Sequence, residues 1–296
     1  MNFEELHFKE LEWIKSIQES LRTPFLDSIM LCLNLADTFP FYVLFITLIW
    51  FSYKRDLGIK LIFLFFITSF INQEAKELLS QPRPCQMDLA VCMIKAKSFG
   101  IPSGAAQSMV TLFGYLCYTI RNKFFWLFSL CFVFLISFSR IYLGLHFFSD
   151  IALGWTLGLI ITGSYIIALP YLENYIKKQV RSTLTIHACL LTAFLSLLIL
   201  NKNSSLVVFS SFGVMLGLIY SKPITDPKKT LYRLERPFIV VLGVFALLMA
   251  TLFLPEKASL INMIVNRLLQ ILAGIWIACL ASPVIKKVEK VLARLT

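Results

Sequence analysis

The sequence predicts an all-α protein, a polytopic transmembrane helical bundle with about nine spans and an N-terminal interfacial helix. Apolar residues make up 58% of the 296 positions, charged residues make up 15%, and the mean hydropathy is +0.76. A soluble domain has about 45–50% apolar and 25% charged residues, so this composition excludes a water-soluble enzyme and a disordered chain. At ~20 residues per span, the length accommodates about eight or nine helices with short loops.

Residues 3–21 form an amphipathic pattern that is too polar to cross a membrane. The apolar residues gather on one face of a helix: Phe3, Leu6, Trp13, Ile14, Ile17 and Leu21. Charged and polar residues occupy the opposite face, which predicts a helix lying on the membrane surface. Pro24 ends this helix. Residues 25–36 are apolar but too short to span, so we expect a re-entrant or tilted piece there.

Nine apolar segments follow as predicted spans: 38–53, 57–79, 103–120, 124–142, 147–169, 183–200, 204–220, 238–254 and 259–281. The longest interval between spans, residues 80–102, is much more polar than its neighbours. A composition break at 171–182 separates the first five spans from the last four. We therefore expect a first bundle at 1–170 and an additional four-span region of unknown role at 171–296.

The charge distribution predicts the orientation of these spans. Of the 28 Lys and Arg residues, 17 lie in the loops 54–60, 121–123, 177–181, 222–236 and 286–294. Cytoplasmic loops carry the excess of positive charge, so the loops 80–102 and 143–146 face the periplasm or exterior. The net charge of +11 follows from this topology, and nucleic acid is not an expected partner. We expect an integral protein of a bacterial cytoplasmic (inner) membrane.

The cysteine and histidine patterns do not indicate a metal site. Seven Cys and three His residues include no CxxC motif and no Cys/His cluster, so we expect no metal. Cys85 and Cys92 share the outward-facing loop, in a compartment that permits disulfides. The sequence leaves two alternatives open at this pair, a disulfide that holds the loop or two free thiols.

Three short segments carry residues that suit chemistry at the outer face: Lys76-x6-Arg83-Pro84, Pro102-Ser103-Gly104 and Ser139-Arg140-x5-His146-x3-Asp150. Taken singly, each has an ordinary structural interpretation, as a snorkelling anchor, a helix cap or a structural His–Asp pair. All three occur in order, at helix ends and on one predicted side of the membrane. This combination favours a shared site.

The first two segments and the arginine of the third suit phosphate binding. Lys76, Arg83 and Arg140 place three cations near the membrane surface, and the planar fork of Arg matches phosphate oxygens. Ser103 stands at a helix N-cap position, where its hydroxyl and the following N–H groups favour anions. Gly104 lets a ligand approach the backbone closely. These residues predict an anion site.

The end of the third segment suits nucleophilic chemistry. His146 and Asp150 are four residues apart, so they share one face of a helix. A carboxylate at this spacing can hold one imidazole N–H and leave the other ring nitrogen free. A histidine held in this way is a competent nucleophile or base.

Together the three segments resemble the signature of the type 2 phosphatidic acid phosphatase family, a lipid phosphate phosphatase family related to the vanadium haloperoxidases. The family signature is K-x6-R-P, then P-S-G-H, then S-R-x5-H-x3-D. In this chain the segments are KELLSQPRP, PSGA and SRIYLGLHFFSD. The resemblance covers roughly residues 20–170. It implies a membrane helical bundle that uses no metal and no organic cofactor.

The resemblance also implies a role for each matching residue. His146 would attack phosphorus to form a phosphohistidine, and Asp150 would orient and polarise His146. Five further residues would bind the phosphoryl oxygens and stabilise charge in the transition state: Lys76, Arg83, Ser103, Gly104 and Arg140. Water, or another acceptor, would then release the phosphate.

One position departs from the signature, because Ala105 stands where the family has the His that protonates the leaving oxygen. General acid catalysis contributes ~10²–10⁴ in rate. Gln107 is nearby, and we consider it as a substitute that positions a water as the proton source. A phosphate monoester expels an alkoxide, whereas a diphosphate expels a phosphate that leaves readily as an anion. We therefore expect a lipid diphosphate, such as a polyprenyl diphosphate, in preference to phosphatidic acid.

The expected function is that of a phosphatase acting on a membrane lipid phosphate or diphosphate at the outer face, through His146. One alternative is a phosphotransferase, in which a lipid or sugar hydroxyl replaces water. A second alternative, a catalytically impaired lipid-phosphate-binding protein or flippase, stays open because of Ala105. The presence of both His146 and Asp150 argues against it, because anion binding alone requires neither residue.

Overall fold

The computed structural model describes residues 3–96, 98–178, 213 and 260–276, and every regular element among them is a helix. Three of these helices are long and apolar enough to cross a membrane, or four if one bent pair counts as one span. The predicted class, an all-helical integral membrane protein, is confirmed. The expected spans at 183–200 and 238–254 lie outside the described residues, so the number of nine spans stays a prediction.

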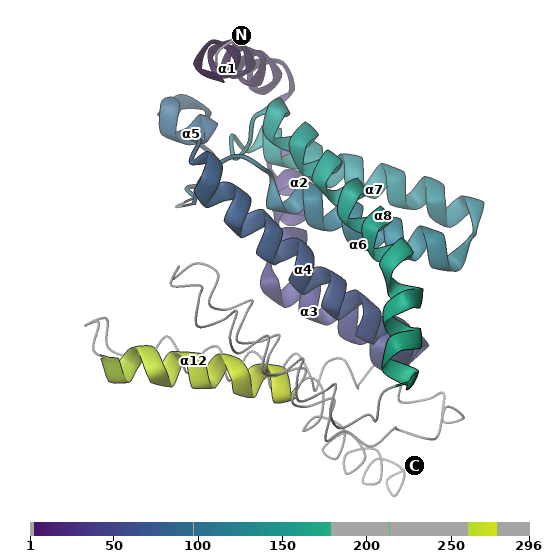
Figure 1. Ribbon diagram of the computed structural model, residues 1–296. Helices are drawn as coiled ribbons and strands as arrows, with labels where there is room; N and C mark the ends of the chain where they lie inside the picture. The colour runs from purple at the N-terminus through teal and green to yellow at the C-terminus, as the bar shows by residue number, and fades with distance from the viewer. Residues whose placement is uncertain (1–2, 97, 179–212, 214–259, 277–296) are drawn as a thin grey trace, which may run out of the picture. The chain divides into compact units, whose positions relative to one another are not determined.

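Figure 1 shows the described elements in chain order. In order they are α1 (Phe3–Leu21), α2 (Pro24–Asn34), the 3-10 turn η1 (Leu35–Asp37), α3 (Phe39–Leu48), the π-turn η2 (Ile49–Tyr53), α4 (Arg55–Leu79), α5 (Pro84–Met87), the 3-10 turn η3 (Leu89–Val91), α6 (Gly104–Ile120), α7 (Lys123–Tyr142), α8 (Phe148–Lys178) and α12 (Leu260–Ile275). The broken helix at α2 and η1 agrees with the expectation that residues 25–36 do not form a straight span.

The chain divides into two compact units. The first consists of Met1–Phe41 and Ile67–Pro170, and the second of Tyr42–Phe66 and Tyr171–Thr296. The expected division into 1–170 and 171–296 stays a prediction. All three segments singled out above lie in the first unit, which is therefore the one that matters for the site.

Close packing of α6 against α8 brings the second and third segments together. Gly154 and Gly158 lie one turn apart on α8. A Cβ at Gly154 would lie 2.7 Å from the Ser103 carbonyl oxygen, and one at Gly158 would lie 2.8 Å from the Gln107 carbonyl oxygen. Small residues four apart allow membrane helices to approach closely in this way. The start of α8 is thereby held against the N-terminus of α6.

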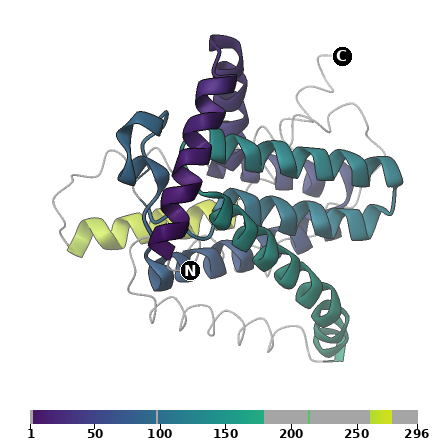
Figure 2. The same cartoon turned by 90° about the horizontal axis from the view of Figure 1, so that it is seen from above.

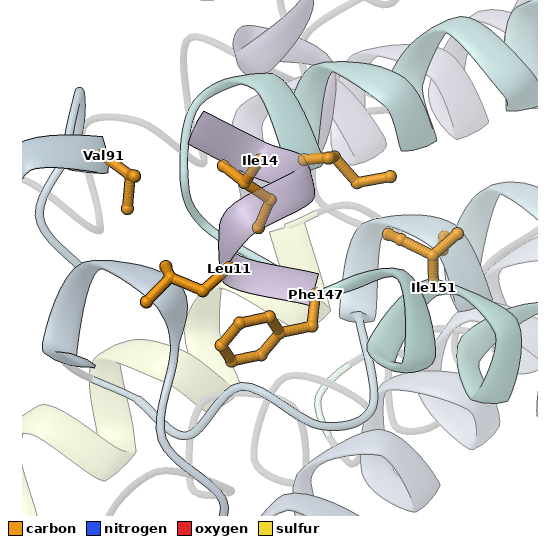
Figure 3. Close-up of a cluster of buried hydrophobic side chains, with 7 residues drawn as sticks. Leu11, Ile14, Val91, Phe147 and Ile151 are labelled. Atoms are coloured by element: carbon orange, nitrogen blue, oxygen red, sulfur yellow. The ribbon is translucent and has the colours of Figure 1, made fainter. Parts of the chain in front are cut away.

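Helix α1 lies across the end of the first unit where the loop 80–102 and the start of α8 are found (Figures 1 and 2). Leu11 and Ile14 on α1 pack with Val91, Phe147 and Ile151 in one buried apolar cluster (Figure 3). The amphipathic helix is confirmed, and its position at the membrane surface stays a prediction. Leu11 and Ile14 pack against the protein, whereas Phe8 and Trp13 on the same helix are exposed.

A second apolar cluster lies on the α2 side of the same end. Met30 of α2 packs there with Tyr142, Leu143 and Leu145. Leu143, Leu145 and Phe147 belong to the short segment between α7 and α8, and Tyr142 is the last residue of α7. That segment is therefore held between an α1 cluster and an α2 cluster. The tight packing fixes the backbone that carries His146.

Candidate active site

The three predicted segments meet at one end of the first unit. The Nη1 atom of Arg83 lies 3.0 Å from Nε2 of His146, which joins the first segment to the third. The backbone N–H of Ser103 donates to the Asp150 carbonyl oxygen at 3.0 Å, which joins the second segment to the third. Sequence spacing alone could only place these residues on one side of the membrane. The structure brings them into contact.

His146 is held by Asp150 as the spacing predicted. The Nδ1 atom of His146 lies 3.1 Å from Oδ2 of Asp150, and the same oxygen accepts the Phe147 N–H at 3.0 Å. Both side chains are buried. Among the described residues, Oδ1 of Asp150 has no hydrogen-bond partner. A proton on Nδ1, donated to the carboxylate, leaves the lone pair of Nε2 as the acceptor for Arg83.

The environment of His146 keeps its imidazole neutral. Burial lowers the pKa of His146 well below its usual value, and the cationic side chains of Arg83, Lys76 and Arg140 lower it further. A neutral imidazole has a free lone pair on one nitrogen, which is what a nucleophile requires. The site therefore holds His146 in its reactive protonation state at neutral pH.

Arg83 ties the outer loop to the segment that carries His146. Its Nε donates to the Ser98 carbonyl oxygen and its Nη2 to the Ser98 hydroxyl, both at 2.8 Å. Its Nη1 donates to the Leu145 carbonyl oxygen at 2.8 Å in addition to the contact with His146. A guanidinium has five N–H groups, so one on Nη2 is not used by these bonds. Arg83 is thus fixed beside the candidate nucleophile.

Lys76, near the end of α4, holds the backbone just before the Pro102-Ser103-Gly104 segment. Its Nζ donates to the carbonyl oxygens of Phe99 and Gly100 at 2.8 and 3.0 Å. An ammonium has three donors, and these contacts use two of them. A Cβ at Gly100 would lie 2.8 Å from the Pro82 carbonyl oxygen, so the close approach of these two loops requires glycine.

The Ser103 side chain caps α6 as predicted, although its bond is long. Its Oγ accepts the N–H of Ala106 at 3.5 Å. A Cβ at Gly104 would lie 3.0 Å from Oδ1 of Asn72 on α4. Close packing against α4 is therefore one structural reason for glycine here, beside the ligand approach expected from the sequence. The N-terminus of a helix is a favourable position for an anion, and α6 begins at Gly104.

Arg140 comes from the last turn of α7 and is almost fully buried, with 2% of its surface exposed. Its Nη1 donates to Oδ1 of Asn34 at 2.6 Å and lies 3.5 Å from Oδ2 of Asp37. Its Nη2 donates to the Leu33 carbonyl oxygen at 3.4 Å. The break between α2 and η1 thus supplies the partners of this cation.

Gln107 has hydrogen-bond partners on α4. Its Nε2 donates to the carbonyl and hydroxyl oxygens of Thr68 at 2.9 and 3.0 Å, and its Oε1 accepts from Asn72 at 2.8 Å. The role of Gln107 in positioning a proton source stays a prediction. Both amide hydrogens and the carbonyl oxygen are engaged with α4, so Gln107 joins two helices.

Ala105 is fully buried in the first turn of α6. Its methyl group carries no proton that a leaving group could accept.

Helix α1 contributes a buried acid that the sequence analysis did not single out. The Glu10 carboxylate accepts the backbone N–H and the hydroxyl of Ser149, each at 2.8 Å. Ser149 is the second residue of α8, so Glu10 caps the helix that carries Asp150. Burial raises the pKa of Glu10, while the bonds from Ser149 oppose this rise. The ring of His7 stacks on Phe147 with centroids 4.3 Å apart.

Several residues at the site were not predicted: Glu10, Asn34, Asp37 and Ser98. Asp37 had a readable signal, since a carboxylate between two apolar helices is costly in a membrane and needs a partner. Glu10 lies within the amphipathic segment 3–21, where nothing distinguishes it from the other charged residues. Asn34 and Ser98 are common polar residues whose partners are distant in sequence.

Other titratable groups give no further site in the described part of the chain. No group of three or more His, Cys, Asp or Glu residues there could hold a metal ion. Cys85 and Cys92 are free thiols that both donate to the Ile94 carbonyl oxygen, at 3.4 and 3.5 Å. The sequence left a disulfide and two free thiols as alternatives for Cys85 and Cys92, and the structure contains two free thiols.

Comparison with known protein families finds a match in the region that contains the candidate site. Residues 57–174 match the family described as the PAP2 superfamily. In this region the chain is similar to that family. The matched range contains the site segments from Lys76 to Asp150, so the expected resemblance is confirmed at the level of the family.

Three curated relatives are phosphatases by name. Lipid phosphate phosphatase delta of Arabidopsis thaliana is 27% identical over 170 residues, which cover 52% of this chain and 41% of the relative. Undecaprenyl-diphosphatase of Sulfolobus acidocaldarius is 30% identical over 110 residues, 36% of this chain and 53% of the relative. Phosphatidylglycerophosphatase B of Bacillus subtilis is 25% identical over 154 residues, 48% of this chain and 74% of the relative.

The chain therefore spans about half the length of the first two relatives. A solved structure of a transmembrane PAP2-type phosphatidylglycerolphosphate phosphatase from Bacillus subtilis is 20% identical, with a TM-score of 0.48. This similarity covers 60% of our chain and 89% of that one.

Proposed function

We propose that the chain is an integral membrane phosphatase that hydrolyses a lipid phosphate or diphosphate through a phosphohistidine at His146. One observation supports this most directly. The neutral imidazole is held between Asp150 at Nδ1 and Arg83 at Nε2, at 3.1 and 3.0 Å. A carboxylate behind the ring and a phosphate-binding cation in front of it are the parts that covalent phosphoryl transfer needs. The names of the curated relatives agree with this class of reaction.

In the first step the Nε2 lone pair of His146 attacks phosphorus, and the bond from phosphorus to the leaving oxygen breaks. The imidazole becomes cationic as the new N–P bond forms. Asp150 stabilises that charge through the proton on Nδ1, which stays on the ring. In the second step a water oxygen attacks phosphorus, the N–P bond breaks and the electron pair returns to Nε2. Inorganic phosphate leaves.

The cations around His146 would bind the phosphoryl oxygens. The contact between Arg83 and Nε2 must open before Nε2 can attack, and a phosphate oxygen is the natural new acceptor for Nη1. Lys76 and Arg83 each have a donor that the bonds to the protein leave unused. The N-terminus of α6, at Gly104, would add a backbone donor. Together these groups stabilise the charge that develops on the phosphoryl oxygens.

The leaving group determines which substrate suits this site best. Ala105 supplies no proton, and Gln107 is engaged with α4. A diphosphate needs no proton for its leaving phosphate, whereas a monoester must expel an alkoxide. The proposed substrate is therefore a lipid diphosphate, such as a polyprenyl diphosphate, presented at the outer face of the membrane. A phosphate leaving group, which needs no proton, favours a diphosphate over phosphatidic acid as the substrate.

The test is phosphate release by the purified protein in detergent micelles, with phosphatidic acid and a polyprenyl diphosphate as substrates. Acid-stable and acid-labile radioactivity on the protein would be compared after a short reaction with a ³²P-labelled substrate. We expect phosphate release and an acid-labile phosphoenzyme that His146→Ala abolishes. Lys123→Gln, an exposed change at the far end of α7, is the matched control. Full turnover in His146→Ala would overturn the mechanism, and transfer to an added alcohol without phosphate release would favour the phosphotransferase.

A further inference from the structure

The carboxylate of Asp37 lies next to Arg140. Its Oδ2 is 3.5 Å from Nη1 of Arg140, and its side chain is 30% exposed. Asn34, three residues earlier, binds the same nitrogen at 2.6 Å. Arg140 is therefore held by one neutral partner and one anionic partner from the same turn.

Asp37 also acts on the other two cations of the site. Its charge interacts electrostatically with both Lys76 and Arg83. Asp150 is also near these cations, but its carboxylate is committed to His146 and to the Phe147 N–H. Asp37 is thus a carboxylate that faces the phosphate-binding cations without holding the candidate nucleophile.

A bound phosphoryl group would occupy the same electrostatic environment. Asp37 adds a carboxylate beside the cations that would bind this group. A phosphate bound to Arg140 is then near a carboxylate of its own sign, and like charges at this range repel each other. A diphosphate carries more negative charge than a phosphate, so the repulsion acts on it more strongly.

We propose that Asp37, through its contact with Arg140, is a specificity-determining residue that lowers the preference of the site for highly charged phosphate groups. This rests on the proposed function of the site as a phosphate site. Asp37 weakens the binding of highly charged phosphate groups, whereas Ala105 slows the departure of a leaving group that needs a proton. The two residues therefore have opposite effects on the choice between monoester and diphosphate, and they act at different steps.

The experiment measures binding of inorganic phosphate and pyrophosphate to the purified protein in detergent, by calorimetry at low and at moderate salt. In Asp37→Asn we expect pyrophosphate binding to tighten by about tenfold more than phosphate binding, because one repulsive charge is gone. The difference should shrink at higher salt. Asn34→Ala is the matched control, since it removes a neutral bond to the same Arg140 nitrogen. It should change both affinities by the same factor.

Asp37→Glu keeps the charge and should keep the wild-type ratio of the two affinities, which a purely structural role would not predict. Asp37→Ser makes the same charge change as Asp37→Asn and replaces it if that variant does not fold. An unchanged ratio in the neutral variants would overturn the assignment of Asp37. If the wild type binds neither ion, the proposed phosphate site itself fails. The two failures are therefore distinguishable.

Discussion

Glu10 offers a sharp test of how α1 supports the site. Its carboxylate accepts two hydrogen bonds of 2.8 Å from Ser149, and 3% of the residue is exposed. Glu10→Ala would remove the acceptor of the Ser149 N–H and hydroxyl, which are half-buried. A fully buried group without a partner costs about 1–3 kcal/mol, and partial access to water lowers this cost, so we expect the free energy of unfolding to fall by about 1–3 kcal/mol in total. Glu10→Gln has nearly the same shape and keeps an acceptor for the N–H, so its loss should be smaller.

Activity should change together with stability, because Ser149 directly precedes Asp150. Without the Glu10 cap, the first turn of α8 loses one of its anchors, and Asp150 is held less firmly against His146. We expect Glu10→Ala to lower kcat while the KM changes little, since no phosphate-binding cation is touched. The measurements are equilibrium unfolding in mixed micelles and phosphate release. Ser149→Ala in the Glu10→Ala background gives the coupling energy, expected at about 1–2 kcal/mol.

The pH dependence separates the charge of Glu10 from its shape. Burial raises the pKa of Glu10 above its unfolded value of 4.5. A group with a raised pKa contributes most stability below its unfolded pKa, and this contribution falls as the pH rises through the folded pKa. Relative to Glu10→Gln, the wild type should therefore be most stable near pH 4.5 and lose that advantage towards pH 8. An advantage that stays constant or grows with pH would refute the reasoning.

Three further predictions concern the proposed mechanism and orientation. Asp150→Asn should lower kcat on the order of 10²–10⁴-fold with the helical circular dichroism unchanged, because the ring loses its anionic partner at Nδ1; wild-type kcat would contradict the role of Asp150. Ala105→His should raise monoester hydrolysis more than diphosphate hydrolysis, although the fully buried position costs about 1–3 kcal/mol of stability; equal changes in both rates would count against the leaving-group explanation. A cysteine at the exposed Lys95 should react with an impermeant maleimide in intact cells, and one at the exposed Lys123 only after lysis; the reverse pattern would invert the proposed topology.

The sequence predicted the parts of the site that depend on local spacing. The four-residue spacing of His146 and Asp150 placed them on one helix face, and the structure has their side chains in contact. Ser103 was expected to cap a helix, and it does. Helices α6 and α7 begin and end within one position of the expected spans 103–120 and 124–142, whereas α8 continues nine residues beyond the expected end at 169. Helix periodicity and capping act over a few residues, so a single sequence contains them.

The parts that the sequence did not predict depend on partners that are far apart in the chain. Gln107 looked available because it lies two residues from Ala105, but its side chain points to Thr68 on another helix. The apolar residues of α1 were expected at the membrane surface, and an amphipathic pattern does not reveal which of them the protein itself covers. Ile14 packs with Phe147 in one buried cluster. Tertiary packing decides which residues meet in both cases.

The contacts of the first forty residues also constrain the order in which the protein can mature during synthesis. Glu10 meets Ser149 across 139 positions, and Asn34 meets Arg140 across 106. The N-terminal helices leave the ribosome long before their partners exist, and closing such long loops is slow. The pocket around His146 can therefore assemble only after α8 has begun to insert. Until then the nascent chain has its membrane segments but no organised catalytic end, which postpones activity until α6, α7 and α8 are all in place.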